Sequence, residues 1–222
     1  MASETQKLDK DELREDEFVE WLANAVQYVQ DNTQAFLAGL AGFVVVLLGI
    51  NYFIESQQQA QIDAAAMLGD LLIAEQSGQI DEALRKGEQL LATYAGTEAS
   101  AQGTVLMGNL HFAVGNYAEA ERYFSDYLAN YDPIDVLAQA ANNGLAACME
   151  AQGQVEQAAQ RYETIAQQHI GQAAAAQALM RAASCYGQLG DRDKQRQLLE
   201  GVVADYTRFP IASRARTKLE ML

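Results

Sequence analysis

Glycine recurs at a nearly constant interval along most of this chain. Gly78, Gly115, Gly153 and Gly190 are separated by 37, 38 and 37 residues, and an alanine follows five residues after each of the first three. Periods of about 20–50 residues are typical of proteins built from stacked copies of one supersecondary unit. Glycine adopts the positive φ of a tight helix–helix turn, and alanine lets the second helix pack close to the first. The spacing therefore predicts a row of stacked helical hairpins.

The second hairpin shows the pattern in most detail. Its small, aromatic and turn-forming residues resemble the tetratricopeptide repeat: Gly108, His111, Gly115, Tyr117, Ala120, Phe124 and Leu128. The end hairpins depart from this pattern, with Gly87 at the aromatic position of the first and Gln195 at the alanine position of the fourth. Terminal repeats lack one neighbour, so atypical residues are expected there. We expect an all-α solenoid of about four hairpins over residues 62–222, ending in a closing helix that begins at Ile211.

Residues 35–54 form the most apolar stretch of the chain. These 20 residues carry no charged side chain, and as a helix they would be about 30 Å long, the thickness of the hydrocarbon core of a bilayer. A cleaved signal peptide is disfavoured, because the stretch begins late, its lead is acidic and no suitable cleavage site follows. The stretch therefore predicts a transmembrane helix. No helix breaker separates it from the first repeat helix.

The lead before this stretch has two parts. Residues 1–10 are polar and are expected to be disordered, whereas residues 11–31 carry apolar side chains at helical spacing. The resulting amphipathic helix would lie in the membrane interface or bind a partner protein. Its apolar stripe includes Phe18, Trp21, Leu22 and Val26. Small residues that would allow close helix–helix contact in the membrane follow at Ala35, Ala38, Gly39 and Gly42.

The charge distribution bounds both topology and function. Three basic residues precede the apolar stretch and none follows it until Arg85, which places the N-terminus in the cytoplasm by the positive-inside rule.

The net charge is −15, and no stripe of basic residues suits the binding of nucleic acid. His111 and His169 lie in different repeats without a catalytic or metal-binding motif, so neither an enzyme, a metal nor a cofactor is expected. Cys148 and Cys185 are expected to be buried, unpaired thiols.

In tetratricopeptide proteins the first helix of each hairpin lines a concave groove that binds protein segments. The resemblance maps this groove onto eight candidate binding residues: Gln102, Val105, Asn109, Phe112, Asn143, Glu150, Met180 and Ser184. None of them is basic, so the grip on a terminal carboxylate that chaperone-binding members use is not expected. A shallow groove of amides and apolar side chains suits an extended or helical segment. The alternative is that the partner binds another surface.

The layout as a whole resembles a second family. An amphipathic lead (EFVEWLANAVQYVQDN), one span and envelope-type repeats, over about residues 17–222, resemble the ancillary Sec-translocon subunits of bacterial inner membranes. The resemblance implies a single-pass protein of the cytoplasmic (inner) membrane with its repeats in the periplasm. It also implies an accessory factor at the secretion machinery that contacts the translocon, emerging chains or chaperones. The alternative is a fixed structural or assembly subunit of a larger membrane complex.

Overall fold

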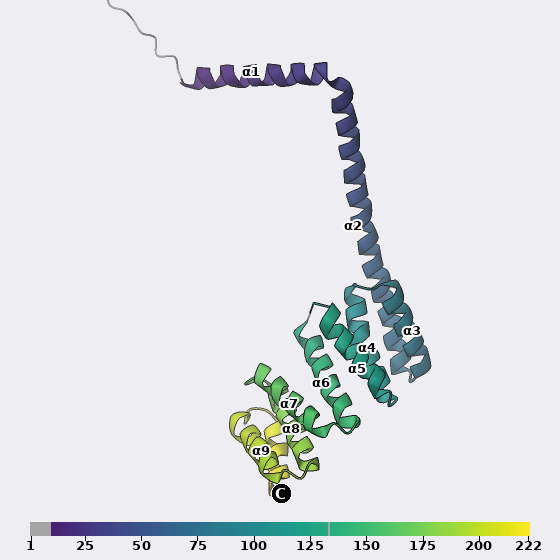
Figure 1. Cartoon of the computed structure of the whole chain (residues 1–222), viewed down its shortest axis with the longest axis vertical. Helices are drawn as coiled ribbons and strands as arrows, with labels where there is room; N and C mark the ends of the chain where they lie inside the picture. The colour runs from purple at the N-terminus through teal and green to yellow at the C-terminus, as the bar shows by residue number, and fades with distance from the viewer. Residues whose placement is uncertain (1–9, 133) are drawn as a thin grey trace, which may run out of the picture. The chain divides into compact units, whose positions relative to one another are not determined.

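The computed structural model describes residues 10–132 and 134–222, and in this part α-helices joined by short turns are the only regular elements (Figure 1). The side chains of residues 10–18 and of Phe36 lie outside the description. Residues 1–9, for which disorder is expected, are also outside the described residues. The chain divides into two compact units, with the boundary between Gln58 and Gln59.

The first unit contains α1 (Lys10–Asp31) and the beginning of α2 (Thr33–Gln76). Polar side chains mark the break between the helices. Asn32 Nδ2 donates to the carbonyl of Tyr28 at 3.1 Å, and Thr33 Oγ1 donates to those of Val29 and Gln30 at 3.1 and 2.8 Å. These bonds pair side-chain donors with carbonyl groups of the last turn of α1, where intrahelical partners run out, and the Tyr28 carbonyl also accepts from the backbone N–H of Asn32 at 3.0 Å. The sequence therefore ends α1 and starts α2 within two residues.

Helix α2 is 44 residues long and contains the apolar stretch predicted to span a membrane. By length and composition it is the one described helix able to cross a bilayer, and its most apolar segment is not buried against other parts of the structure. As predicted, the helix continues without a break into the second unit. There its buried residues recur at helical spacing, at Ala64, Leu68, Leu71 and Ala74. The same helix therefore carries the apolar stretch and the first helix of the repeats.

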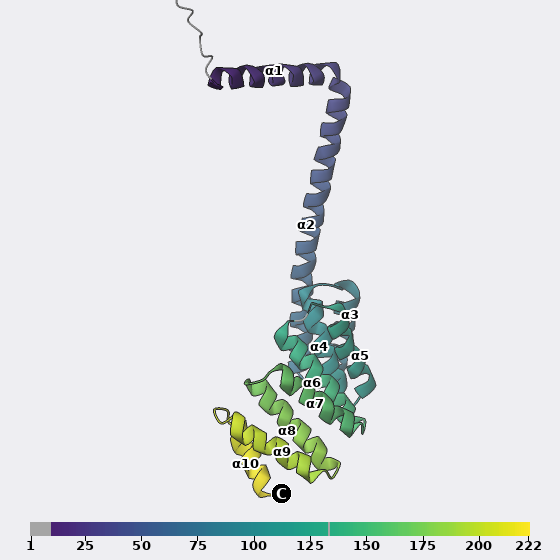
Figure 2. The ribbon, with the colours of Figure 1, turned by 60° about the vertical axis from the view of Figure 1, so that its left-hand side comes forward.

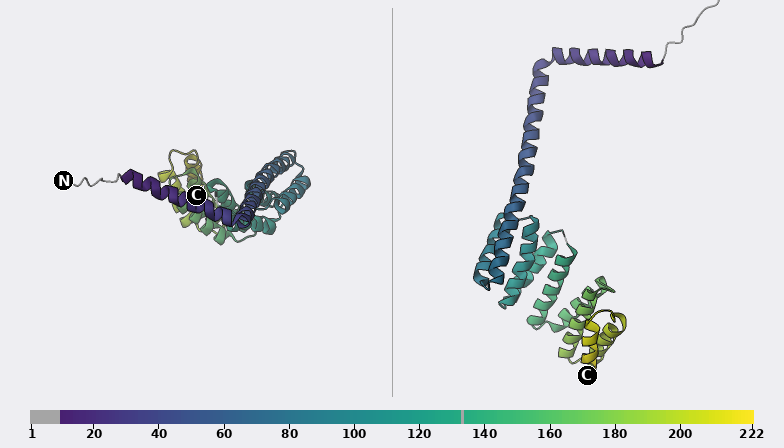
Figure 3. Two further views of the ribbon diagram at one scale, coloured as in Figure 1. Left: turned by 90° about the horizontal axis from the view of Figure 1, so that it is seen from above. Right: turned by 180° about the vertical axis from the view of Figure 1, so that it is seen from behind.

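The second unit is a row of four helical hairpins and a closing helix (Figure 2). The last part of α2 pairs with α3 (Ile80–Thr93). The next pairs are α4 (Glu98–Ala113) with α5 (Tyr117–Asn130), α6 (Asp135–Ala151) with α7 (Val155–Gln168), and α8 (Ala173–Gln188) with α9 (Arg192–Asp205). Helix α10 (Ile211–Glu220) then packs on α9 and α8. Seen from behind, successive hairpins again lie side by side (Figure 3). The predicted all-α solenoid is confirmed.

The periodic glycines form the turns within the hairpins. Their φ angles are +71° at Gly78, +81° at Gly115, +80° at Gly153 and +79° at Gly190, in the left-handed region that other residues rarely adopt. Nothing lies within 4 Å of the position of a Cβ atom on any of them. The backbone conformation, and not a lack of space, therefore requires glycine at these turns.

Phe124 occupies the centre of the second hairpin's contact with the third. The residue is 1% exposed, and its ring lies against Gly108 of α4 and Gly144 of α6. A Cβ atom added to Gly108 would be 2.6 Å from the ring, and a Cβ atom added to Gly144 would overlap the ring. The contact between the first and second hairpins is packed differently. There the side chain of Met107 lies against Gly87, and a Cβ atom on Gly87 would overlap it. Methionine therefore fills the space where an aromatic residue is missing from the first repeat.

Candidate protein-binding groove

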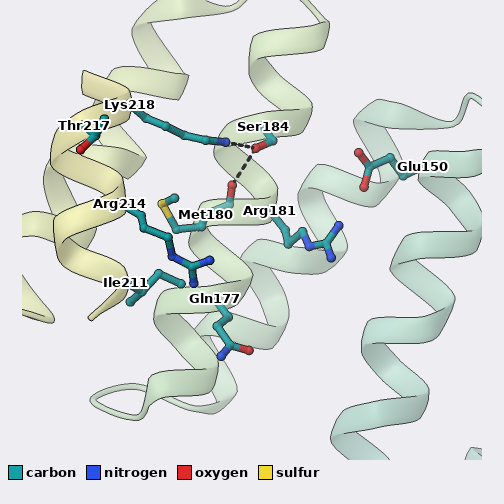
Figure 4. Close-up of a pocket in the computed structure, with 9 residues that line it drawn as sticks. All are labelled: Glu150, Gln177, Met180, Arg181, Ser184, Ile211, Arg214, Thr217 and Lys218. Carbon is teal, nitrogen blue, oxygen red and sulfur yellow. Dashed lines mark hydrogen bonds between the residues drawn. The ribbon is translucent and has the colours of Figure 1, made fainter. Parts of the chain in front are cut away.

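Two adjoining cavities follow the even-numbered helices of the second unit. The central cavity has a volume of about 390 Å³ and is lined mainly by α4, α6 and α8, with Phe124 and Tyr162 contributed by α5 and α7. The C-terminal cavity has a volume of about 570 Å³ and lies among α6, α8 and α10 (Figure 4). Both cavities are lined by Gln177 and Arg181. We call the two cavities together the groove.

The central cavity combines an aromatic floor with amide side chains. Phe112 stands against Tyr117 with the ring centroids 5.2 Å apart, and Tyr162 is almost completely buried beneath the cavity. Asn109 is exposed at the rim, and Asn143 Nδ2 donates to the carbonyl of Gln139 at 2.9 Å. Apolar surface with a few oriented polar groups suits a bound peptide segment, since the amides can pair with its backbone.

Six of the eight candidate groove residues line these two cavities. Asn109, Phe112 and Asn143 face the central cavity. Glu150, Met180 and Ser184 face the C-terminal cavity. Gln102 lies in a third cavity of about 380 Å³, between α2 and α4. The repeat spacing therefore brings most of the candidates onto one face of the second unit.

Val105 is the one candidate that is buried in the core. It is 3% exposed and packs with Ala101, Ala120 and Phe124 in the core. Helix α4 contacts α3, α5 and α6, so a larger part of its circumference is buried than the repeat pattern suggests. Val105 is therefore a core residue and does not present its side chain to a ligand.

Sequence reasoning missed the basic residues of the groove. Arg181 faces both cavities, and Arg214 and Lys218 of the closing helix line the C-terminal cavity. None of the eight candidate residues is basic, as expected, but these three residues add positive charge beside them. Arg181 follows Met180 directly and is displaced from the positions that the repeat pattern marks, and α10 lies outside the repeats. One signal was present, because nine of the 15 basic residues follow residue 130.

The polar contacts of the C-terminal cavity involve few carboxylates. Lys218 Nζ donates to Ser184 Oγ at 2.9 Å, and Ser184 Oγ donates to the carbonyl of Met180 at 3.1 Å (Figure 4). Glu150, on α6, accepts a hydrogen bond from Gln188 Nε2 at 2.9 Å. Arg181, Arg214 and Lys218 form no ion pair within the part of the chain that the structure describes.

The two histidines have structural surroundings. The His111 ring stacks on the Tyr123 ring with centroids 5.2 Å apart. The guanidinium carbon of Arg122 lies over the Tyr123 ring, 4.3 Å from its centroid. His169 ends α7. Among the side chains that the structure describes, no group of three or more potential metal ligands is close enough to hold an ion.

The two cysteines are fully buried and unpaired, as expected from their repeat positions. Burial raises the pKa of Cys148 to about 11, with a further contribution from the negative charge of Glu121. Burial likewise raises the pKa of Cys185 to about 11, with Glu150 as the next cause. A thiol that stays protonated reacts slowly, because the thiolate is the nucleophile.

We expect neither thiol to react with a thiol reagent at about pH 8 while the protein is folded, and both to react in denaturant. The measurement is labelling of the full chain followed by mass spectrometry. In the unfolded chain these thiols lose their protons near pH 9, and in the folded chain near pH 11. The unfolded state therefore binds fewer protons between these values, and stability should fall as the pH rises through them. Rapid labelling of the folded protein would contradict this prediction.

The candidate partner helix of the first unit exposes its apolar residues. Trp21 is 64% exposed, and Leu22 and Val26 are also exposed on α1, whereas the side chain of Phe18 lies outside the description. Of the four small residues on α2, Ala35 and Gly39 line a cavity of about 450 Å³ beside α1. Ala38 and Gly42 are exposed.

Comparison with known proteins gives a family and a fold. Residues 27–197 match the family described as the tetratricopeptide repeat-like domain. Among solved structures, a protein of Podosopora anserina described as a kinesin light chain with nearly identical repeats is 19% identical. The match covers 65% of this chain and 75% of the other, with a TM-score of 0.56.

PcrH from Pseudomonas aeruginosa is 26% identical over 56% of this chain and 92% of its own, with a TM-score of 0.48. PcrH in complex with the chaperone-binding region of PopB is 25% identical over 55% and 97% of the two chains, with a TM-score of 0.47. No match is found among curated proteins.

Proposed function

Because the chain belongs to the tetratricopeptide repeat-like family, we propose that it is a membrane-anchored scaffold that binds a segment of a partner protein in its groove. The observation that carries this proposal is the row of cavities along α4, α6, α8 and α10. Solenoids present extended concave surfaces of this kind to their ligands. A scaffold needs no catalytic group, and we propose no enzymatic activity.

The membrane anchor is the apolar part of α2. Its length and composition fit one crossing of a bilayer. The lack of basic residues between this stretch and Arg85 supports an N-terminus in the cytoplasm and a repeat domain on the other side of the cytoplasmic membrane.

The finer proposal is an accessory factor at the secretion machinery, which contacts the translocon and either emerging chains or chaperones. It is supported by the layout of an acidic lead, one apolar helix and repeats. The second candidate is a fixed subunit of a larger membrane complex. The exposed apolar side chains of Trp21, Leu22 and Val26 favour that candidate, because such a stripe is commonly covered by a partner or by lipid.

Site-specific photo-crosslinking in native membranes tests the groove. A probe replaces Asn143 in the central cavity, and a matched probe replaces Gln160, which is exposed on α7 and lines neither cavity. We expect protein adducts from Asn143 and few from Gln160. Adducts from Gln160 alone would contradict binding in the groove.

A third probe at Trp21 separates the two functional candidates. An accessory factor should give translocon subunits from Trp21 and secreted chains or chaperones from Asn143. A fixed subunit should give one unchanging partner from both positions. Adducts of unrelated membrane proteins at Trp21, with no translocon subunit among them, would contradict the secretion role.

A further inference from the structure

Given a partner segment in the groove, as proposed above, we propose that its acidic side chains occupy the C-terminal cavity and pair with Arg181, Arg214 and Lys218. The occupant is thus an acidic stretch within a protein chain, with at least two Asp or Glu residues beside an apolar one. The juxtaposition of three basic side chains from two helices around one cavity carries this inference.

The three cations come from elements that the fold brings together. Arg214 and Lys218 are four residues apart on α10 and therefore lie on the same helix face. Figure 4 shows both side chains extending from α10 toward α8, whereas Arg181 extends from α8 toward α6. Since Arg181 also lines the central cavity, a segment along the groove would meet Arg181 first and the two residues of α10 next. Positive charge distributed in this way fits several carboxylates better than one terminal carboxylate.

Among the described side chains, no carboxylate forms an ion pair with any of these three cations. Elsewhere in the second unit, Lys86 pairs with Asp70 at 3.2 Å and Lys194 pairs with Glu163 at 2.9 Å. In the C-terminal cavity, Lys218 Nζ donates to the hydroxyl group of Ser184, and Glu150 is the single carboxylate among the lining residues. The chain has twice as many acidic as basic residues, so a cavity with an excess of cations is a local reversal of its charge. Such a reversal attracts an acidic segment and fixes its register.

Apolar surface beside the cations favours a peptide over a simple anion. Met180 and Ile211 line the same cavity, and the groove continues to the aromatic floor at Phe112 and Tyr162. A peptide that alternates acidic and apolar side chains can use both kinds of surface. Its backbone can pair with the amides of Gln177 and Asn143.

The test is binding of a fluorescent ten-residue peptide with three aspartates among leucines to the full chain in detergent. The variants are Arg214→Glu with Lys218→Glu in the C-terminal cavity, and Arg216→Glu, which is exposed on the same helix and outside the cavity. We expect the double variant to weaken binding at least about tenfold and the Arg216 variant to leave it within about twofold. Circular dichroism and the melting temperature establish that each variant is folded.

Two further peptides identify the chemistry that is recognised. Replacing the aspartates with asparagine should weaken binding at least about tenfold, and amidating the C-terminus should change it little. Equal binding of the asparagine peptide, or loss of binding on amidation alone, would overturn the inference of an internal acidic segment.

Crosslinking separates this inference from the proposed function. If native partners still react at Asn143 with unchanged yield in the double variant, the acidic segment is refuted and binding in the groove stands. If Asn143 gives no protein adduct in the unchanged protein, the groove proposal itself fails.

Discussion

Replacing Phe124 with alanine is expected to lower the free energy of unfolding of the repeat unit by about 3–5 kcal/mol. The ring is 1% exposed and packs with Val105, Tyr127 and Leu145 in the core between the second and third hairpins. The surrounding helices are already as close as their backbones allow at the two neighbouring glycines, so they cannot supply side-chain atoms to fill the space. A cavity should therefore remain, and its cost adds to the loss of buried apolar surface.

Denaturant unfolding of the full chain in detergent, followed by circular dichroism, measures this effect. The matched control is Val136→Ala, because Val136 is 73% exposed and its loss should change stability by no more than about 0.5 kcal/mol. A loss below about 1 kcal/mol at Phe124 would contradict the close packing around the ring.

Replacing Gly144 with alanine is expected to destabilise the same contact by about 1–3 kcal/mol. In an unconstrained helix this change would stabilise by up to about 1 kcal/mol, because alanine has the higher helix propensity. Here the added methyl group would overlap the ring of Phe124, which cannot move without disturbing Gly108 on its other side. Steric overlap should therefore outweigh helix propensity.

Gly201→Ala is the control for helix propensity, since nothing lies within 4 Å of a Cβ at that position in α9. It should stabilise the protein or leave it unchanged. Combining Gly144→Ala with Phe124→Leu should cost less than the sum of the two single changes, because the smaller side chain makes room for the methyl group. Strict additivity would show that the methyl group and the ring do not compete for the same space.

The turn glycines and the helix-interior glycines were accessible to sequence reasoning to different degrees. Gly115 is part of a periodic pattern, and its positive φ follows from the need for a tight turn. Gly144 breaks no pattern and has an ordinary helical backbone. Its importance comes from Phe124, which lies 20 residues earlier and in another hairpin. Spacing along one helix cannot reveal such a contact.

The groove residues also divide into those that the sequence could predict and those that depend on tertiary contacts. Repeat spacing predicted the face that contains Asn109, Asn143 and Ser184, because equivalent residues of stacked hairpins share one side. It also assigned Val105 to that face, although the contacts of α4 with three other helices bury it. The positions on α10 could not be placed by the repeat pattern, since the closing helix is not a repeat.

The sequence by itself determined the helical hairpins, their turns and the apolar helix, because each depends on residue types at fixed spacing within one segment. Only the tertiary structure decided that the groove ends in a cavity with three cations. Arg181 and the pair Arg214 and Lys218 are 33 or more residues apart. They meet because α10 packs against α8 and α9, and that packing depends on side-chain shapes from several helices together.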